Sequence, residues 1–355
     1  MNKLLVVLLG LCVLAGVYLA LVPGPVDAVA YRPPLAPPMT GVLQPNEKLK
    51  AAELIGVGQV IGPEDVAVDD QGRIYGGTLD GRILRVDGDR VESFADTGGR
   101  PLGLHFDARG NLIVCDAVKG LLSVNVSGEV RVLATEADGV PFGFTDDLDI
   151  ASDGRLYFSD ASSRHHVHDY LLDCIEARPY GRLLRFDPQT GETEVLLREL
   201  YFANGVALSP DENFVLVNET YRCRVTRFWL KGPRKGQHDV FIDNLPGFPD
   251  GISSNRQGIF WVAMFTVRNS TMDHLHPHPW AKNLLARLPK GLWPKPKPYG
   301  LVLALDASGT IIRSLHDTNG DHLRTVTSVE EHNGFIYCGS LYNDRIGRLR
   351  VADIL

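Results

Sequence analysis

Short apolar runs separated by turns rich in aspartate and glycine recur along the chain from residue 64 to its end. A representative unit has the run LDIASDGRLYFSD at residues 148–160 and a further strand, GRLLRFD, at residues 181–187. Alternating or continuous apolar runs of about four to eight residues between such turns are typical of β-strands. Six units of this kind follow one another, at residues 66–88, 102–128, 148–187, 205–229, 252–309 and 328–351.

These six units predict an all-β fold, a six-bladed β-propeller. One unit is too small to bury both faces of its strands, whereas neighbouring units arranged around an axis cover one another. The repeat period of about 40 residues or more agrees with this architecture. The apolar segment at residues 52–60 precedes the first unit, and we expect it to supply the outermost strand of the last unit and close the ring.

Two units contain long insertions, at residues 164–179 and 266–293, and the second includes a short amphipathic helix predicted at residues 280–288. Insertions of this kind commonly form lids over a rigid scaffold. Histidines gather in both insertions, and alternating histidines suit a zinc ion. Prolines interrupt the run from residue 274 to residue 278, so the favoured interpretation is a solvent-exposed lid.

The N-terminus differs from the rest of the chain because Leu4 to Val22 form an uncharged, apolar run of about 19 residues. It is interpreted as a signal anchor, since it is longer than the apolar core of most signal peptides; a signal peptide cleaved near residues 26–28 is the alternative. The predicted organisation is a membrane anchor or signal segment at residues 1–23, a proline-rich linker at 24–50 and the propeller at 51–355. The propeller is expected outside the cytoplasm, in a periplasmic, lumenal or extracellular space, either membrane-anchored by a single pass or secreted.

The formal net charge of −7 argues against nucleic acid as a partner, because nucleic-acid-binding proteins normally carry clustered Lys and Arg and an excess of positive charge. A small-molecule substrate fits better. The oligomeric state is left open.

Five cysteines are widely spaced and contain no CxxC motif. One disulfide, between Cys174 and Cys223, is a candidate. Buried, unreactive thiols are the favoured interpretation of Cys115 and Cys338, which lie within apolar strands.

In a propeller, the residue just before each innermost strand points toward the central axis. The six residues at these positions are Glu64, Leu102, Asp146, Asn204, Asp250 and Thr327. Four of them are carboxylates or an amide, and Ca²⁺ prefers such oxygen ligands. Asp and Asn are also common turn residues, but their coincidence at equivalent positions favours a calcium site formed by Glu64, Asp146, Asn204 and Asp250. Asp147 is an alternative ligand or a neighbour that orients Asp146.

Several stretches resemble the strictosidine synthase-like family, which includes the adipocyte plasma membrane-associated proteins. They are GPEDV at 62–66, GRPLGL at 99–104, FTDDL at 144–148, DYLL at 169–172, FANGVALSP at 202–210, PGFPD at 246–250 and EHNG at 331–334. More distant relatives are the paraoxonases, the gluconolactonases of the senescence marker type and diisopropyl fluorophosphatase. The resemblance implies a calcium ion held by Glu, Asn and Asp side chains and hydrolysis of lactones, aryl esters or organophosphates.

Glu64, Asn204 and Asp250 match the ligand pattern that the resemblance implies, whereas Asp146 stands where these hydrolases usually have Asn. The third carboxylate favours ion binding and weakens polarisation of a substrate oxygen. Thr327 occupies the position of the glutamate that strictosidine synthase uses, which argues against its condensation chemistry. Leu102 occupies the position of the paraoxonase histidine, which argues against a histidine dyad.

The resulting hypothesis is a calcium-dependent hydrolase of esters or lactones, of arylesterase or lactonase type, at the central tunnel of a membrane-tethered propeller. Asp250 is the first candidate for general base and His105 the second. No G-x-S-x-G motif for a serine hydrolase is present. The alternatives are a binding propeller with a structural calcium and a strictosidine synthase-like lyase.

Overall fold

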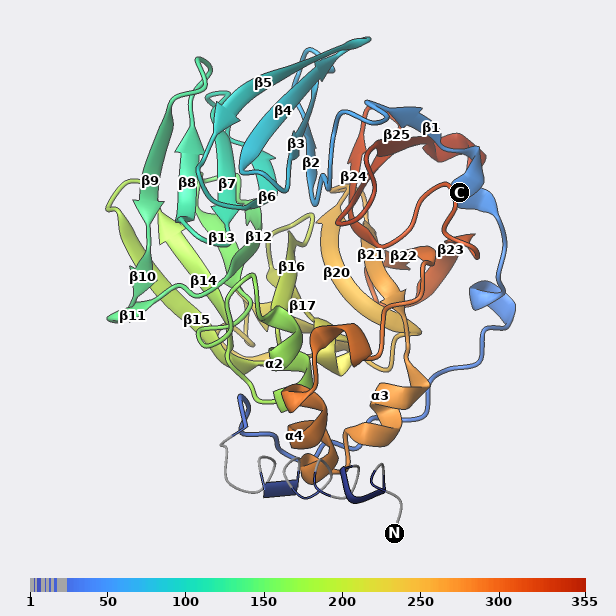
Figure 1. Cartoon of the computed structure of the whole chain (residues 1–355). Coiled ribbons are helices and arrows are strands. Elements are labelled where there is room, and N and C mark those ends of the chain that lie inside the picture. Colours follow the sequence, from blue (N-terminus) through green and yellow to red (C-terminus); the bar gives the residue numbers. More distant parts are fainter. Residues whose placement is uncertain (1–2, 4, 8–9, 11–12, 14–15, 18–23) are drawn as a thin grey trace.

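The computed structural model describes residues 3, 5–7, 10, 13, 16, 17 and 24–355 and contains six four-stranded antiparallel sheets around a common axis (Figure 1). The all-β six-bladed propeller is therefore confirmed. The first three blades are β2 (Val66–Val68), β3 (Ile74–Gly77), β4 (Arg82–Asp87) and β5 (Arg90–Asp96); β6 (Pro101–Phe106), β7 (Leu112–Asp116), β8 (Gly120–Val124) and β9 (Val130–Ala134); and β12 (Thr145–Ile150), β13 (Leu156–Asp160), β14 (Gly181–Asp187) and β15 (Glu192–Leu200).

The fourth, fifth and sixth blades follow the same order from the axis outward. They are β16 (Ala203–Leu208), β17 (Phe214–Glu219), β18 (Arg224–Trp229) and β19 (His238–Ile242); β20 (Gly247–Ser254), β21 (Ile259–Val267), β22 (Gly300–Asp306) and β23 (Ile311–Asp317); and β24 (Val326–His332), β25 (Phe335–Ser340), β26 (Ile346–Arg350) and β1 (Glu53–Ile55). A small hairpin, β10 (Glu136–Ala137) and β11 (Val140–Pro141), connects the second and third blades.

The ring closes between the two ends of the propeller. Strand β1 pairs antiparallel with β26, with Leu54 opposite Gly347. This confirms that the segment before the first unit supplies the outermost strand of the last blade. Pairing of β1 satisfies the outward edge of β26 and ties the start of the propeller to its end.

The hydrophobic core lies between the blades, because each sheet presents alternate residues to its two neighbours. In the first blade, Ala67 and Tyr75 pack against the second blade, while Val66 and Ile74 pack against the sixth. The other four contacts between neighbouring blades contain equivalent clusters. The repeated apolar runs of the sequence are thus the interfaces of the ring.

The two insertions form helices that gather at one end of the propeller (Figure 1). The first contains α2 (Tyr170–Glu176), and the second contains α3 (Ser270–Leu275), α4 (Pro279–Arg287) and the short 3₁₀ turn η4 (Lys290–Leu292). The side chain of Asn269 caps α3, and Pro279 begins α4, as is common at a first helical turn. Helix α2 contacts α4, so the insertions form one lid, and the helix predicted at residues 280–288 is confirmed with a shift of one residue.

Residues 24–50, expected to be a linker, pack against the folded protein. Val26 is buried under the lid, and Leu49, in the 3₁₀ turn η2 (Lys48–Ala51), is fully buried against the fifth and sixth blades. The backbone N–H of Val29 donates to the carbonyl of Glu176 at 3.1 Å. A second 3₁₀ turn, η1 (Gly41–Leu43), packs against β23.

Most of the apolar run from residue 4 to residue 22 lies outside the described residues. Among the residues that are described, no helix is long and apolar enough to cross a membrane. The anchor or signal segment therefore remains a prediction.

Within the described part of the chain, all four cysteines are buried and free, so the candidate disulfide between Cys174 and Cys223 is absent. Burial raises the pKa of both thiols to about 12, which keeps them protonated and unreactive.

The buried His316 of β23 makes stability dependent on pH. Its ring nitrogens lie 2.9 Å from the Tyr299 hydroxyl and 2.8 Å from the Ser314 hydroxyl. Burial lowers its pKa from 6.5 to about 4. Because the unfolded chain takes up the proton first as pH falls, the stability that neutral His316 contributes is present above pH 6.5 and is lost toward pH 4.

We expect acidification to about pH 5 to lower the free energy of unfolding by about 2 kcal/mol more in the wild type than in His316→Gln. Urea denaturation of both proteins at several pH values measures this difference. An equal pH dependence in the two proteins would contradict the assignment.

Candidate functional site

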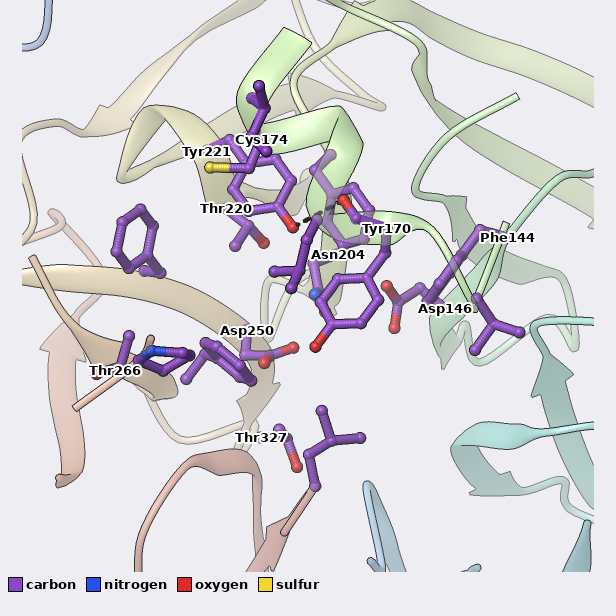
Figure 2. A pocket seen from close by; sticks show the side chains of 18 of the residues that line it. Phe144, Asp146, Tyr170, Cys174, Asn204, Thr220, Tyr221, Asp250, Thr266 and Thr327 are labelled. Carbon is purple, nitrogen blue, oxygen red and sulfur yellow. Dashed lines mark hydrogen bonds between the residues drawn. The ribbon is translucent and has the colours of Figure 1, made fainter. Parts of the chain in front are cut away.

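The predicted site residues converge at the end of the axis that the lid covers. Glu64, Asp146, Asn204 and Asp250 are all buried and line one pocket. Figure 2 shows Asp146 and Asp250 on opposite sides of this pocket, with Asn204 between them. Thr327 also borders the pocket and has no carboxylate to offer, and its hydroxyl donates to the carbonyl of Glu64 at 2.6 Å.

Bulges in the innermost strands place most of these side chains. The pairing register shifts between Thr145 and Leu148, between Ala203 and Val206, and between Pro249 and Ile252. Asp146, Asn204 and Asp250 lie inside these three shifts. A bulge adds an unpaired residue to one strand and turns its side chain out of the regular alternation, which here directs it to the axis.

The residue after each site residue controls how closely neighbouring blades approach. A Cβ atom on Gly205 would lie 2.4 Å from the backbone nitrogen of Ile252 in the next blade, and one on Gly103 would lie 2.7 Å from the carbonyl oxygen of Asp146. Gly205 therefore makes room for the neighbouring inner strand.

Where this following residue is aspartate, its carboxylate links two blades. Asp147 accepts hydrogen bonds from the backbone N–H groups of Leu148 at 2.8 Å and Val206 at 2.9 Å. Asp65 makes the equivalent bridge to Leu104, at 2.7 Å. The structure thus places Asp147 in the ring contacts, outside the pocket that holds Asp146.

The carboxylates of the pocket carry an excess of negative charge. Burial, together with the charges of Asp250 and Asp146, raises the pKa of Glu64 well above its usual range, and burial with the charge of Asp250 does the same for Asp146. Burial raises the pKa of Asp250 to about 7, against the opposing hydrogen bond from Asn204. Burial of three carboxylates in one pocket favours a bound cation.

Arg100 supplies the positive charge that sequence reasoning missed. It is buried beside the pocket, and its guanidinium donates to the carbonyls of Gly62 at 3.0 Å and Gly77 at 3.2 Å. Its charge acts on both Glu64 and Asp146. Three carboxylates and one guanidinium give the pocket a formal charge of −2, which matches a divalent cation.

The donor chemistry fits calcium, because the pocket offers carboxylate and amide oxygens and no histidine or cysteine ligand at its floor. Among the described residues, no group of three Asp, Glu, His or Cys side chains is already drawn together around a common ion position.

His105 lies in a different chamber of the tunnel, beyond the carboxylates, with Asp65, Asp149 and Glu330. Its Nε2 atom is 3.4 Å from Asp149 Oδ1. Burial lowers the pKa of His105, but the hydrogen bond to Asp149 and the charge of Asp149 raise it more, to about 9. The ring is thus protonated at neutral pH and has no free site to accept a proton. His105 does not line the pocket, although Glu64, Asn204 and Thr327 border both chambers.

The walls of the pocket above the carboxylates are apolar and come from both lid and propeller. The pocket encloses about 140 Å³. The lid contributes Val167, Tyr170, Leu171, Met272, Leu285 and Trp293, and the propeller contributes Phe144, Phe202, Tyr221, Phe248 and Phe265. The arrangement fits a ligand with a polar group near the carboxylates and an apolar remainder.

Tyr170, at the start of α2, is a further residue that the sequence did not single out. Its ring extends into the pocket, and its hydroxyl points toward the space between Asp146 and Asp250 (Figure 2). The same hydroxyl lies 3.2 Å from that of Tyr342. It belongs to the DYLL stretch, but that stretch gave no sign of which element it would face.

Four of the six lid histidines are exposed, as expected: His166, His168, His274 and His278. The other two are not. His165 and His276 are buried, and His165 Nε2 lies 2.5 Å from Glu176 Oε2. Their packing holds the lid together and leaves no zinc-like arrangement among the described residues.

The protein is thus a six-bladed propeller with an axial pocket that is rich in oxygen atoms, negatively charged and covered by an apolar lid. The strictosidine synthase model matches residues 146–233, and the strictosidine synthase-like N-terminal model matches residues 41–86. The chain is 40% identical to adipocyte plasma membrane-associated protein of Bos taurus, over 94% of this chain and 86% of that protein. It is 38% identical to protein strictosidine synthase-like 6 of Arabidopsis thaliana, over 92% of this chain and 87% of that protein. The chain belongs to the strictosidine synthase-like family.

Solved structures show the same fold at much lower identity. A gluconolactonase from Xanthomonas campestris superposes with a TM-score of 0.62 at 19% identity, covering 93% of this chain and 96% of that chain. Regucalcin from Agrobacterium tumefaciens, described as a calcium-binding protein, superposes with a TM-score of 0.59 at 14% identity, covering 83% and 92%.

The close approach of the inner strands predicts that Gly205→Ala is strongly destabilising. The added Cβ would overlap the backbone of Ile252, which cannot rotate away as a side chain can. We expect a loss of about 3 kcal/mol or more in the free energy of unfolding, measured by urea denaturation.

Gly291→Ala is the matched control, because a Cβ there meets nothing within 4 Å. We expect it to change stability by less than about 0.5 kcal/mol. Similar losses in the two variants would contradict the proposed packing role of Gly205.

Proposed function

We propose that this protein is a calcium-dependent hydrolase of carboxylic esters or lactones, tethered to a membrane by its N-terminal apolar run with the propeller outside the cytoplasm. The observation that carries the proposal is the cluster of Glu64, Asp146 and Asp250 at the floor of an apolar pocket. The three carboxylates are buried, and one guanidinium, that of Arg100, does not balance their charge. The gluconolactonases among the structural neighbours support a lactone or ester as the substrate class.

A calcium ion held by Glu64, Asp146, Asn204 and Asp250 would polarise the substrate carbonyl and stabilise negative charge on its oxygen. The chain's own residues bind the substrate and balance charge in the pocket. The apolar walls bind the acyl or aryl part of the substrate and exclude water from it. Arg100 limits the repulsion among the carboxylates.

Asp250 is the proposed general base. It accepts a proton from the attacking water, the water oxygen bonds to the carbonyl carbon, and the bond to the leaving alcohol oxygen breaks. The proton then passes to that oxygen, so the products are a carboxylic acid and an alcohol. Tyr170 is suited to orient the substrate, since its hydroxyl faces the carboxylates from the lid.

This function predicts hydrolysis of phenyl acetate or a small lactone by the full chain in detergent, lost on chelation and restored by calcium. We expect Asp250→Asn to lower kcat by about 100-fold or more, because it removes the base. Calcium should still raise the melting temperature of this variant, since the other three ligands remain.

His105→Gln is the control, because His105 lies in the other chamber, and it should keep wild-type turnover. Asp250→Asn with unchanged turnover would remove Asp250 from the base role. A calcium-dependent rise in melting temperature without turnover of any ester or lactone would instead support a binding propeller with a structural ion.

The third carboxylate gives a separate prediction. Asp146→Asn removes one negative charge from a pocket of formal charge −2, so calcium should bind about tenfold more weakly. Turnover at saturating calcium should be equal or higher, because a less neutralised ion polarises the carbonyl more strongly. Calcium titrations of activity and of melting temperature measure both effects, and tighter calcium binding in the variant would contradict the charge argument.

A further inference from the structure

The chain enters the folded protein at the outer face of the lid. A Cβ atom on Gly24 would lie 3.4 Å from both Asn283 Oδ1 and Arg287 Nε, so this residue lies directly against α4. The next residues are fixed as well, because the backbone N–H of Asp27 donates to Glu176 at 2.8 Å and Arg178 pairs with the Asp27 carboxylate at 2.6 Å. The segment from Gly24 to Asp27 is therefore packed against α4 and hydrogen-bonded to α2 and the residues that follow it.

The apolar run ends only two residues before this contact, at Val22. Two residues of extended chain span at most about 7 Å. Whatever surface holds the apolar run must therefore lie beside α4. A spacer of 27 residues between membrane and propeller, as residues 24–50 alone suggested, is excluded by the packing of Val26 and Leu49.

The outer face of the lid exposes several large apolar side chains to solvent. Trp280 is 71% exposed, Leu292 is 68% exposed and Leu288 is 38% exposed, whereas Leu285 of the same helix is buried in the pocket wall. The exposed Lys295 and Lys297 follow in the sequence. Tryptophan is enriched at the membrane–water interface, and lysines beside apolar side chains are attracted to anionic headgroups.

We propose that the outer lid face, defined by Trp280, Leu288 and Leu292, lies in the headgroup layer of the bilayer that holds the apolar run. This inference rests on the membrane tether of the proposed function. The same lid segments then form the pocket wall and the outer lid face, because Leu285 lies between Trp280 and Leu288 in the sequence, and Trp293 directly follows Leu292; both Leu285 and Trp293 line the pocket. The substrates that this orientation favours are apolar esters or lactones dissolved in the lipid, which reach the carboxylates through the lid.

The test uses the full chain reconstituted in phosphatidylcholine vesicles that contain brominated acyl chains, which quench nearby tryptophans. We expect bromolipid quenching in the wild type to fall at least about twofold in Trp280→Phe, because Trp261 and Trp293 are buried and Trp229 lies in β18 of the propeller. Gln257→Trp, in the hairpin between β20 and β21 at the far end of the inner strand, is the matched control in the Trp280→Phe background and should not restore quenching.

A second readout uses activity. Leu292→Glu should slow hydrolysis of a long-chain ester embedded in the vesicles at least about threefold, while hydrolysis of water-soluble phenyl acetate stays unchanged, because the charge opposes seating of the lid in the interface. Val126→Glu is the control, since Val126 is 73% exposed in the turn between β8 and β9, away from the lid.

The outcomes separate this inference from the function on which it rests. The orientation is wrong and the tether stands if the chain floats with vesicles but Trp280→Phe leaves quenching unchanged. The same holds if Gln257→Trp in the Trp280→Phe background is quenched as strongly as the wild type. If the chain does not float with vesicles, both the tether and this inference are overturned. Calcium-dependent turnover of phenyl acetate in detergent tests the hydrolase independently of either result.

Discussion

Six innermost strands must meet around one axis, and the space between their backbones limits every other feature of the molecule. The structure meets this constraint with two kinds of residue after five of the six axial positions, and Ser328 follows the sixth, Thr327. Gly103, Gly205 and Gly251 let a neighbouring backbone approach where a Cβ would overlap it. Asp65 and Asp147 instead satisfy the backbone N–H groups of the next blade with their carboxylates. The bulges that accommodate this contact are also what turn the site residues inward.

The same closure concentrates charge. Side chains directed to the axis from several blades have few other neighbours, so the carboxylates of Glu64, Asp146 and Asp250 face one another in a buried space. Arg100 offsets only part of this charge and is itself held by backbone carbonyls. The pocket floor is therefore negatively charged and its walls are apolar, and the cores between the blades keep this unfavourable cluster of carboxylates in place.

The lid and the segment at residues 24–50 are joined by a buried lysine. Lys282 is fully buried in α4, and its ammonium donates to the carbonyl of Val29 at 2.7 Å and to that of Glu176 at 3.4 Å. One side chain thus joins the N-terminal segment, α2 and α4.

The sequence by itself determined the six units, the closing strand and the convergence of Glu64, Asp146, Asn204 and Asp250, because a regular repeat places equivalent residues at equivalent positions around an axis. Tertiary structure alone decided how far along the axis each side chain lies and where the segments outside the repeat pack. His105 is three residues beyond Leu102, and about 10 Å along a strand is enough to move it into the second chamber. Arg100 and Tyr170 reach the pocket through a turn and an insertion whose paths no periodicity describes. The docking of residues 24–50 depends on contacts with distant segments, which a proline-rich composition cannot reveal.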